Sequence, residues 1–113
     1  GALADVAVTE VDAPVSVIAG EAVDVRVTVG NLGTQGVLGE VTVMLTDEAN
    51  SVSIGKETLS DGLPAGAREV LTFTWDTSAS VAGNHLLKAT HNHTDQTSNN
   101  DSLSVPVTVN EAD

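Results

Sequence analysis

The sequence has no cysteine and no tyrosine, and it has one tryptophan and one phenylalanine in 113 residues. The absence of cysteine excludes disulfides, thiolate metal ligands and thiol nucleophiles. It also favours a prokaryotic source, since eukaryotic exported domains of this size often carry disulfides. Long apolar runs are missing too, because no segment approaches the roughly 18 apolar residues that a membrane-spanning helix needs. The sequence therefore predicts no insertion into a membrane.

Positive charge is also scarce. Arg26, Lys56, Arg68 and Lys88 stand against sixteen aspartates and glutamates, and the formal net charge is −12 at pH 7. Such a surface repels the phosphates of nucleic acids and the headgroups of anionic lipids, so neither is expected as a partner. Little lysine with much Asp, Glu, Ala, Val and Thr is similar to the composition of salt-adapted proteins.

What the sequence has in abundance is alternation of apolar and polar residues with a period of two, the pattern of β-strands with one buried face. Residues 21–31 show it most clearly, because Val23, Val25, Val27 and Val29 share one face. Comparable segments occupy residues 4–11, 15–21, 39–47, 52–63, 67–76, 85–91 and 101–110. Turn-forming Gly, Asn and Pro residues separate them. The sequence predicts an all-β fold, an antiparallel β-sandwich of seven or eight strands.

The aromatic residues fall on the inward faces of this pattern. Leu71, Phe73 and Trp75 alternate along one strand, so we expect core packing from both aromatics instead of an exposed sugar-binding platform. The other expected core residues are Val25, Val27 and Leu87. A second expectation concerns Pro106, which has no N–H to donate, so the last strand should lie at a sheet edge or bulge there.

One stretch, HNHTDQTSNND at residues 91–101, concentrates polar and metal-ligating side chains. His91, His93 and Asp95 share parity, and together they could bind zinc if the strand continued through them. His85 has the same parity but lies about 20 Å away along a strand. Because that face also holds apolar residues, the favoured interpretation places His91 at the rim of the core.

Calcium is the second metal considered for this stretch. Asp95, Asn99, Asn100 and Asp101 offer the oxygen ligands that calcium prefers, without an EF-hand spacing. The alternative is turn formation, since Asn and Asp side chains bond to nearby backbone groups. We expect no metal and no cofactor here.

Catalytic motifs are lacking. No serine occupies a G-x-S-x-G elbow, and the paired carboxylates Asp47 and Glu48 fall in a predicted loop, where a solvated turn is expected. The sequence predicts a protein that is not an enzyme.

Four segments in order resemble the CARDB domain, the cell adhesion related domain of bacteria and archaea. They are ADVAVTEVDAP…AGEAVDVRVTVGNLGTQ, LPAGAREVLTFTW, AGNHLLKAT and SNNDSLSVPVTV. The resemblance implies an immunoglobulin-like or fibronectin-III-like sandwich and no general catalytic residues. It extends over nearly the whole chain, so residues 1–113 are expected to form one domain, with tails at 1–3 and 110–113. The sequence departs from the family at His91 and Asn92, where members tend to have an apolar residue and an aspartate.

The resemblance also implies a context. We expect a non-catalytic extracellular module of an exported prokaryotic surface protein, monomeric when isolated, that spaces or docks other domains. Its expected partners are neighbouring domains of the same polypeptide, a surface protein or a polysaccharide. The alternative is a ligand-recognition module that binds carbohydrate or mediates calcium-dependent adhesion.

Replacing Trp75 by alanine tests the predicted inward face. Deleting a buried indole leaves a cavity, so the free energy of unfolding should fall by roughly 3–5 kcal/mol in a denaturant titration. An unchanged unfolding midpoint would show that Trp75 does not lie on the inward face of its strand.

Overall fold

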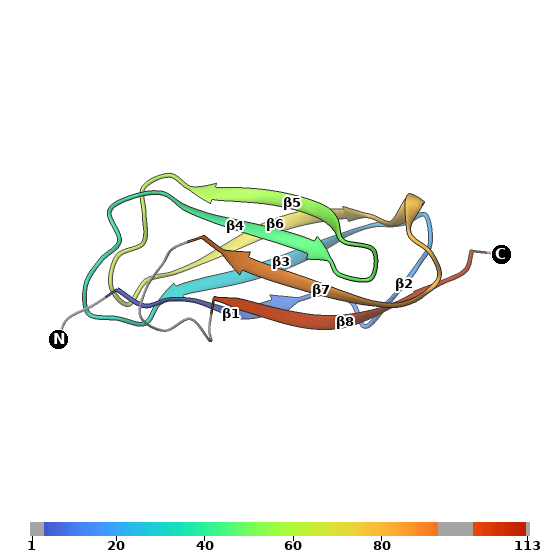
Figure 1. Ribbon diagram of the computed structural model, residues 1–113, viewed down its shortest axis with the longest axis horizontal. Coiled ribbons are helices and arrows are strands. Elements are labelled where there is room, and N and C mark those ends of the chain that lie inside the picture. Colours follow the sequence, from blue (N-terminus) through green and yellow to red (C-terminus); the bar gives the residue numbers. More distant parts are fainter. Residues whose placement is uncertain (1–3, 93–100, 113) are drawn as a thin grey trace.

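The alternating segments fold into eight strands in two layers, with the long axis of the molecule along the strands (Figure 1). The computed structural model describes residues 4–92 and 101–112. Its strands are β1 (Val6–Asp12), β2 (Ser16–Ile18), β3 (Ala22–Asn31), β4 (Val41–Asp47), β5 (Val52–Leu59), β6 (Arg68–Asp76), β7 (Gly83–His91) and β8 (Ser102–Asn110), and a 3₁₀ turn, η1 (Thr77–Ala79), follows β6. The predicted all-β sandwich is confirmed.

One sheet has the strand order β1-β3-β6 and the other β2-β8-β7-β4-β5. Every described pairing is antiparallel except one, because β2 runs parallel to β8 along Ser16–Ile18. The predicted antiparallel sandwich is therefore confirmed, and the short β2–β8 pair is a parallel addition to it. β8 includes Asn110, the first residue of the expected C-terminal tail.

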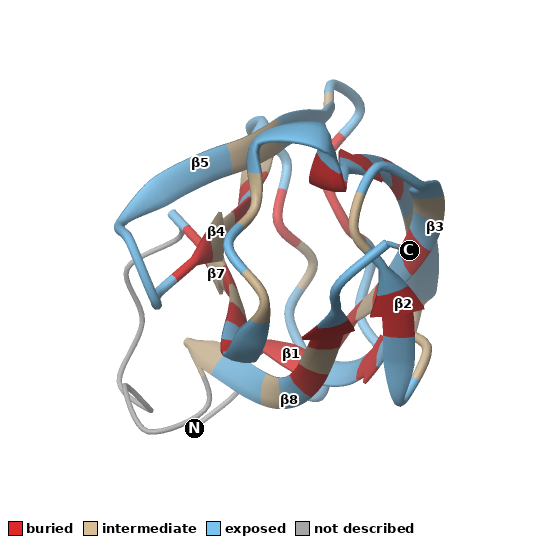
Figure 2. Ribbon diagram, turned by 90° about the vertical axis from the view of Figure 1, so that its right-hand side faces the viewer, coloured by how far each residue is buried: buried red, intermediate tan, exposed pale blue. Residues whose placement is uncertain are grey.

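The core lies between the sheets and consists mostly of valine (Figure 2). Val25, Val27, Leu87, Phe73 and Trp75 are all buried, as predicted, whereas Leu71 is only partly buried at the edge of the cluster. Burial along β8 declines toward its start: Val107 and Val109 are buried, Val105 is partly buried and Leu103 is 36% exposed.

Pro106 lies on a free sheet edge, as predicted. Its neighbour on one side is Leu86 of β7, while β2 pairs with β8 only from Thr108 onward. The backbone N–H of Thr108 points to the β2 side, where it donates to the Val15 carbonyl at 3.0 Å. Pro106 has the same parity, so its nitrogen points to that side too, beyond the end of β2, where no ladder bond is required.

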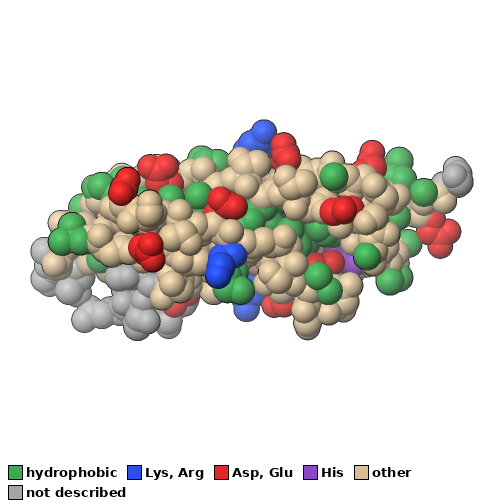
Figure 3. Space-filling model, turned by 90° about the horizontal axis from the view of Figure 1, so that it is seen from above, with side chains coloured by type: hydrophobic (Ala, Val, Ile, Leu, Met, Phe, Trp, Pro, Cys, Tyr) green, Lys and Arg blue, Asp and Glu red, His purple; other side chains and the backbone are tan. Residues whose placement is uncertain are grey.

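No helix in the described part of the chain is long and apolar enough to cross a membrane. The acidic excess appears as Asp and Glu side chains scattered over the surface, with few Lys or Arg among them (Figure 3).

One buried amide joins three separate segments at the end of β3. Asn31 is 1% exposed. Its Oδ1 accepts the backbone N–H groups of Asp5 and Gly33, both at 3.0 Å. Its Nδ2 donates to the carbonyls of Gln35, at 2.9 Å, and Leu63, at 3.1 Å. An asparagine amide has two donors and a two-acceptor oxygen, so this side chain is fully satisfied.

Asn31→Ala removes all four bonds and leaves the part-buried Gly33 N–H and Gln35 carbonyl unsatisfied, while the Leu63 carbonyl keeps the Val37 N–H at 2.9 Å as a donor. Each such buried group costs about 1–3 kcal/mol, and partial access of water to these groups reduces the sum, so we expect a loss of about 2–4 kcal/mol in the free energy of unfolding.

The matched control is Asn92→Ala, which removes one exposed bond from Asn92 Oδ1 to the Thr42 N–H. It should cost about 1 kcal/mol or less. Equal losses for the two variants, measured by urea denaturation, would contradict the role assigned to Asn31.

Candidate functional site

The stretch singled out in the sequence begins where β7 ends. His91 is buried at the rim of the core, as predicted, and its Nε2 lies 3.1 Å from Oδ1 of Asp101. The backbone N–H of His91 donates to the Asp101 carbonyl at 3.1 Å. The structure therefore joins the two ends of the stretch, one imidazole facing one carboxylate.

The remaining candidates, His93, Asp95, Asn99 and Asn100, lie outside the described residues. Across residues 4–92 and 101–112, no group of three or more His, Cys, Asp or Glu side chains could hold a metal ion. His91 and Asp101 supply only two ligands, and a zinc or calcium site needs more. The zinc and calcium hypotheses thus stay predictions.

A second buried polar pair lies near the opposite end of the same sheet. His85 Nδ1 is 2.7 Å from Asp47 Oδ2, and His85 Nε2 is 2.6 Å from the Val81 carbonyl oxygen. Asp47 is 2% exposed and His85 4%. The other oxygen of Asp47, Oδ1, accepts the Ala49 N–H at 3.1 Å.

The solvated turn that we predicted for Asp47 is wrong, and the reason is parity. Asp47 is the last residue of β4 and follows the inward positions Val41, Val43 and Leu45 at steps of two. His85 is likewise inward on β7, two residues before Leu87. The alternation of apolar and polar residues already puts a polar residue at an inward position in each of these two strands. That pattern could have indicated a buried polar pair.

Both ring nitrogens of His85 face acceptors, so the imidazolium, which donates from both, is the form that satisfies them. Burial lowers the pKa of His85, but the hydrogen bonds to the Val81 carbonyl and to Asp47, together with the Asp47 charge, outweigh it and raise the pKa above its ordinary value. The pair is therefore a buried ion pair at mildly acid pH.

This arrangement is not catalytic machinery. In an Asp–His–nucleophile triad the distal imidazole nitrogen takes a proton from a hydroxyl or thiol. In this chain that nitrogen, Nε2 of His85, lies 2.6 Å from the Val81 carbonyl oxygen and donates a hydrogen bond to it. His85 consequently has no free lone pair to act as a base or as a metal ligand.

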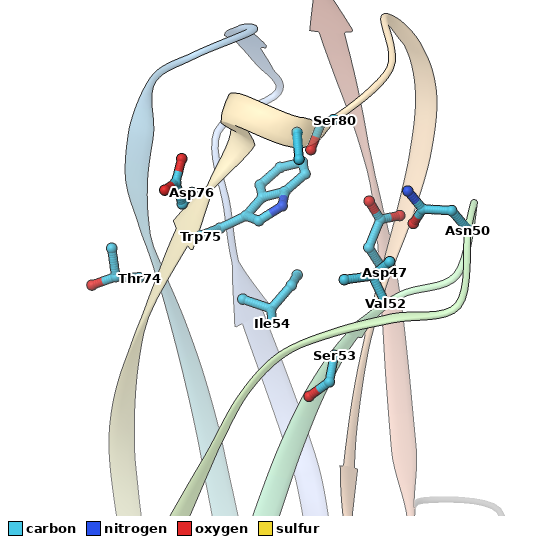
Figure 4. A pocket seen from close by; sticks show the side chains of 10 residues that line it. Asp47, Asn50, Val52, Ser53, Ile54, Thr74, Trp75, Asp76 and Ser80 are labelled. Carbon is cyan, nitrogen blue, oxygen red and sulfur yellow. The ribbon is translucent and has the colours of Figure 1, made fainter.

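A pocket of about 220 Å³ opens beside the pair, between the β4–β5 hairpin and the β6–η1 segment (Figure 4). The Trp75 ring forms part of its wall and packs against His85, with ring centroids 5.9 Å apart at an interplanar angle of 59°. The other residues that line it are Asp47, Asn50, Val52, Ser53, Ile54, Thr74, Asp76, Ala79 and Ser80. Nothing in the sequence pattern marks this pocket, because it depends on how the hairpin and η1 meet.

Comparison with protein families finds that the family model described as CARDB matches residues 3–103. A search of curated proteins finds no match.

Among solved structures, a crystal structure of a CARDB domain from Pyrococcus furiosus, in complex with di-metal ions, is 26% identical, with a TM-score of 0.79 over 94% of this chain and 88% of that one. A solution structure of a Pyrococcus furiosus CARDB domain is 24% identical, with a TM-score of 0.79 over 97% of this chain and 98% of that one. A β-glucosidase from Listeria innocua in complex with glucose is 20% identical, with a TM-score of 0.61 over 96% of this chain. The match covers 16% of the glucosidase, so it shows the sandwich fold alone.

The buried ion pair predicts a dependence of stability on pH. The pKa of His85 is higher in the folded than in the unfolded chain, where it is about 6.5. Its contribution is therefore complete below about pH 6.5 and is lost as the pH rises through the folded-state pKa. We expect the free energy of unfolding, measured by urea titration, to fall over this range.

His85→Gln should remove this fall, since glutamine does not titrate. A decline of the same size in wild type and His85→Gln would assign it to another group.

Proposed function

The chain belongs to the CARDB family, and from this membership we propose that it is a non-catalytic extracellular module that spaces and holds other domains of an exported prokaryotic protein. The single observation that carries the proposal is the position of the chain ends. The described chain enters β1 at one end of the long axis and leaves β8 at the other (Figure 1). The molecule measures 55 × 23 × 19 Å, so domains joined to the two ends are held a module length apart.

The strand pairing suits such a position. Domains pulled apart load the module along its strands, first through β1 and its partner β3 and then through β2 and β8. β2 and β8 are parallel, and a force on the chain ends pulls β2 toward its N-terminal end and β8 toward its C-terminal end. The hydrogen bonds between the two strands are therefore loaded in shear, all at once, and do not open one by one. The Thr108 N–H donates to the Val15 carbonyl at 3.0 Å, and the Ala19 N–H donates to the Asn110 carbonyl at 2.8 Å.

The Asp47–His85 pair supports the same function by its chemistry. It ties β4 to β7 with both imidazole nitrogens occupied, so this histidine and carboxylate hold two strands together and do not activate a nucleophile. The partners that we propose are neighbouring domains of the same polypeptide, and the location is the cell exterior.

Ala19→Pro tests whether the parallel pair bears load. Ala19 precedes Gly20, whose φ is 103°, and the Glu21 N–H donates to the Ile18 carbonyl at 3.0 Å, which makes a type II turn with Ala19 at its second position. Proline is favoured there, so the substitution keeps the turn and removes the N–H that reaches Asn110. The lost bond (about 0.5–1.5 kcal/mol) and the stiffer unfolded chain (about 0.4–1 kcal/mol) nearly cancel, so stability should change by less than about 1 kcal/mol. The unfolding force in a single-molecule pull from both ends should fall.

Ala65→Pro is the matched control. Ala65 has the same place in a second type II turn, before Gly66 with φ 77° and with the Ala67 N–H donating to the Pro64 carbonyl at 3.0 Å. Within the described residues its N–H makes no bond to a neighbouring strand, so the unfolding force should not change. Equal forces for wild type and both variants would contradict the load-bearing role.

A further inference from the structure

The pocket beside Trp75 contains a hydrogen-bond donor that no described residue uses and that solvent reaches. The Trp75 side chain belongs to a residue only 3% exposed. Its indole N–H has no hydrogen-bond partner in the described part of the chain, and Figure 4 shows the ring nitrogen on the side that faces Asp47 and Asn50. The N–H is not among the buried polar atoms that lack a partner, so water reaches it through the pocket, and an acceptor that enters the pocket takes the place of that water. The partner is therefore expected from outside the chain, as an oxygen acceptor in the pocket.

The charges around the pocket define the class of that acceptor. Asp47 and Asp76 both line the pocket, and it has no lysine or arginine. The Ser78 N–H donates to Asp76 at 2.9 Å and lowers the pKa of Asp76, which keeps this carboxylate ionised. The ionised Asp76 and the absence of lysine and arginine from the lining disfavour phosphates, sulfates and carboxylates, whereas Asp47 is buried and paired with His85.

The uncharged polar groups of the pocket narrow the class further. Ser53, Ser80 and Asn50 line it, and their side chains make no hydrogen bond to any described residue, whereas the Thr74 hydroxyl points away from Trp75 (Figure 4). A ligand that enters the pocket can accept from the indole N–H and donate to the oxygen atoms of Asp76, Asn50 and the serines. A hydroxyl group does both, and a ligand with several hydroxyls uses several of these groups at once. The apolar side chains of Ile54 and Val52 provide a surface for the C–H side of such a molecule.

Size limits the ligand to one ring. The volume of about 220 Å³ is below the range of about 300–1,000 Å³ that is usual for drug-sized ligands. We propose that the pocket between the β4–β5 hairpin and the β6–η1 segment binds one uncharged sugar unit, either a free monosaccharide or the end of a polysaccharide chain, with the Trp75 N–H donating to one of its oxygens. The contact is made by the edge of the indole, unlike the face-on stacking for which an exposed aromatic is needed.

The single tryptophan makes the test direct, because the chain has one indole N–H resonance. ¹⁵N-labelled protein is titrated with neutral monosaccharides (glucose, galactose, mannose and N-acetylglucosamine), their methyl glycosides, and glucuronate. We expect at least one neutral sugar to shift the indole resonance saturably, and glucuronate to bind more weakly than glucose. A methyl glycoside that binds as well as its parent sugar identifies a chain end as the occupant, and one that fails to bind identifies the free sugar.

Three variants separate the pocket from general effects on folding. Trp75→Phe keeps an aromatic ring and removes the N–H, so the affinity for the sugar should fall by about 2- to 10-fold. The affinity of this variant is measured from the chemical shifts of the neighbouring backbone amides. Asn50→Ala, at the pocket, should also weaken binding. Asn84→Ala makes the same change on an exposed residue of β7 outside the pocket and should leave it unchanged.

Three results would overturn the proposal. They are the absence of a saturable shift with every neutral sugar up to its solubility limit, equal binding of glucuronate and glucose, and unchanged affinity in Trp75→Phe. The first means that water alone satisfies the indole N–H. None of them bears on the spacing function, which depends on the chain ends and on β2 and β8.

Discussion

A polar group that points into this sandwich has to find its partner inside it, and this constraint accounts for most of what is particular to the chain. The buried polar residues are Asn31, Asp47, Thr77, His85 and His91, and each lies at an inward position or at the end of a strand. Asn31 binds three loop segments, and Asp47 and His85 pair across β4 and β7. Thr77 donates to the Glu21 carbonyl at 2.6 Å and accepts the Gly20 N–H at 3.1 Å. The valine core supplies the cohesion, and these groups determine which loops are held to which strands.

The alternation of apolar residues was enough to predict the strands, the inward faces and the edge position of Pro106. Each of these depends on local sequence, because a strand's parity decides which side chains are buried. Parity also placed Asp47 and His85 inward. The prediction of a solvated turn failed at Asp47 because the adjacent Glu48 suggested a loop. Asp47 points into the core, whereas Glu48 is exposed.

Features that depend on contacts between distant segments were beyond the sequence. The three residues of β2 have no pattern that distinguishes a parallel from an antiparallel partner, and the choice follows from the route of the chain between β1 and β3. The pocket arises where residues 47–54 meet residues 74–80, segments separated by some twenty positions. The family resemblance supplied the architecture and the context, but no residue of this pocket.

The parallel pair and the pocket are linked through η1. Thr77, the first residue of η1, holds the turn between β2 and β3 by its bonds to Gly20 and Glu21. Asp76, directly before it in the chain, and Ala79, two residues after it, line the pocket. Force carried by β2 therefore acts on the turn that positions one wall of the pocket, and a ligand that bridges η1 to the β4–β5 hairpin would resist movement of that wall. By linkage, a ligand that binds only the folded arrangement stabilises it by an amount that grows with the logarithm of the ratio of its concentration to its dissociation constant. A sugar-occupied module would then be mechanically firmer at the end where the chain leaves it, so that the binding and spacing roles reinforce each other while depending on different atoms.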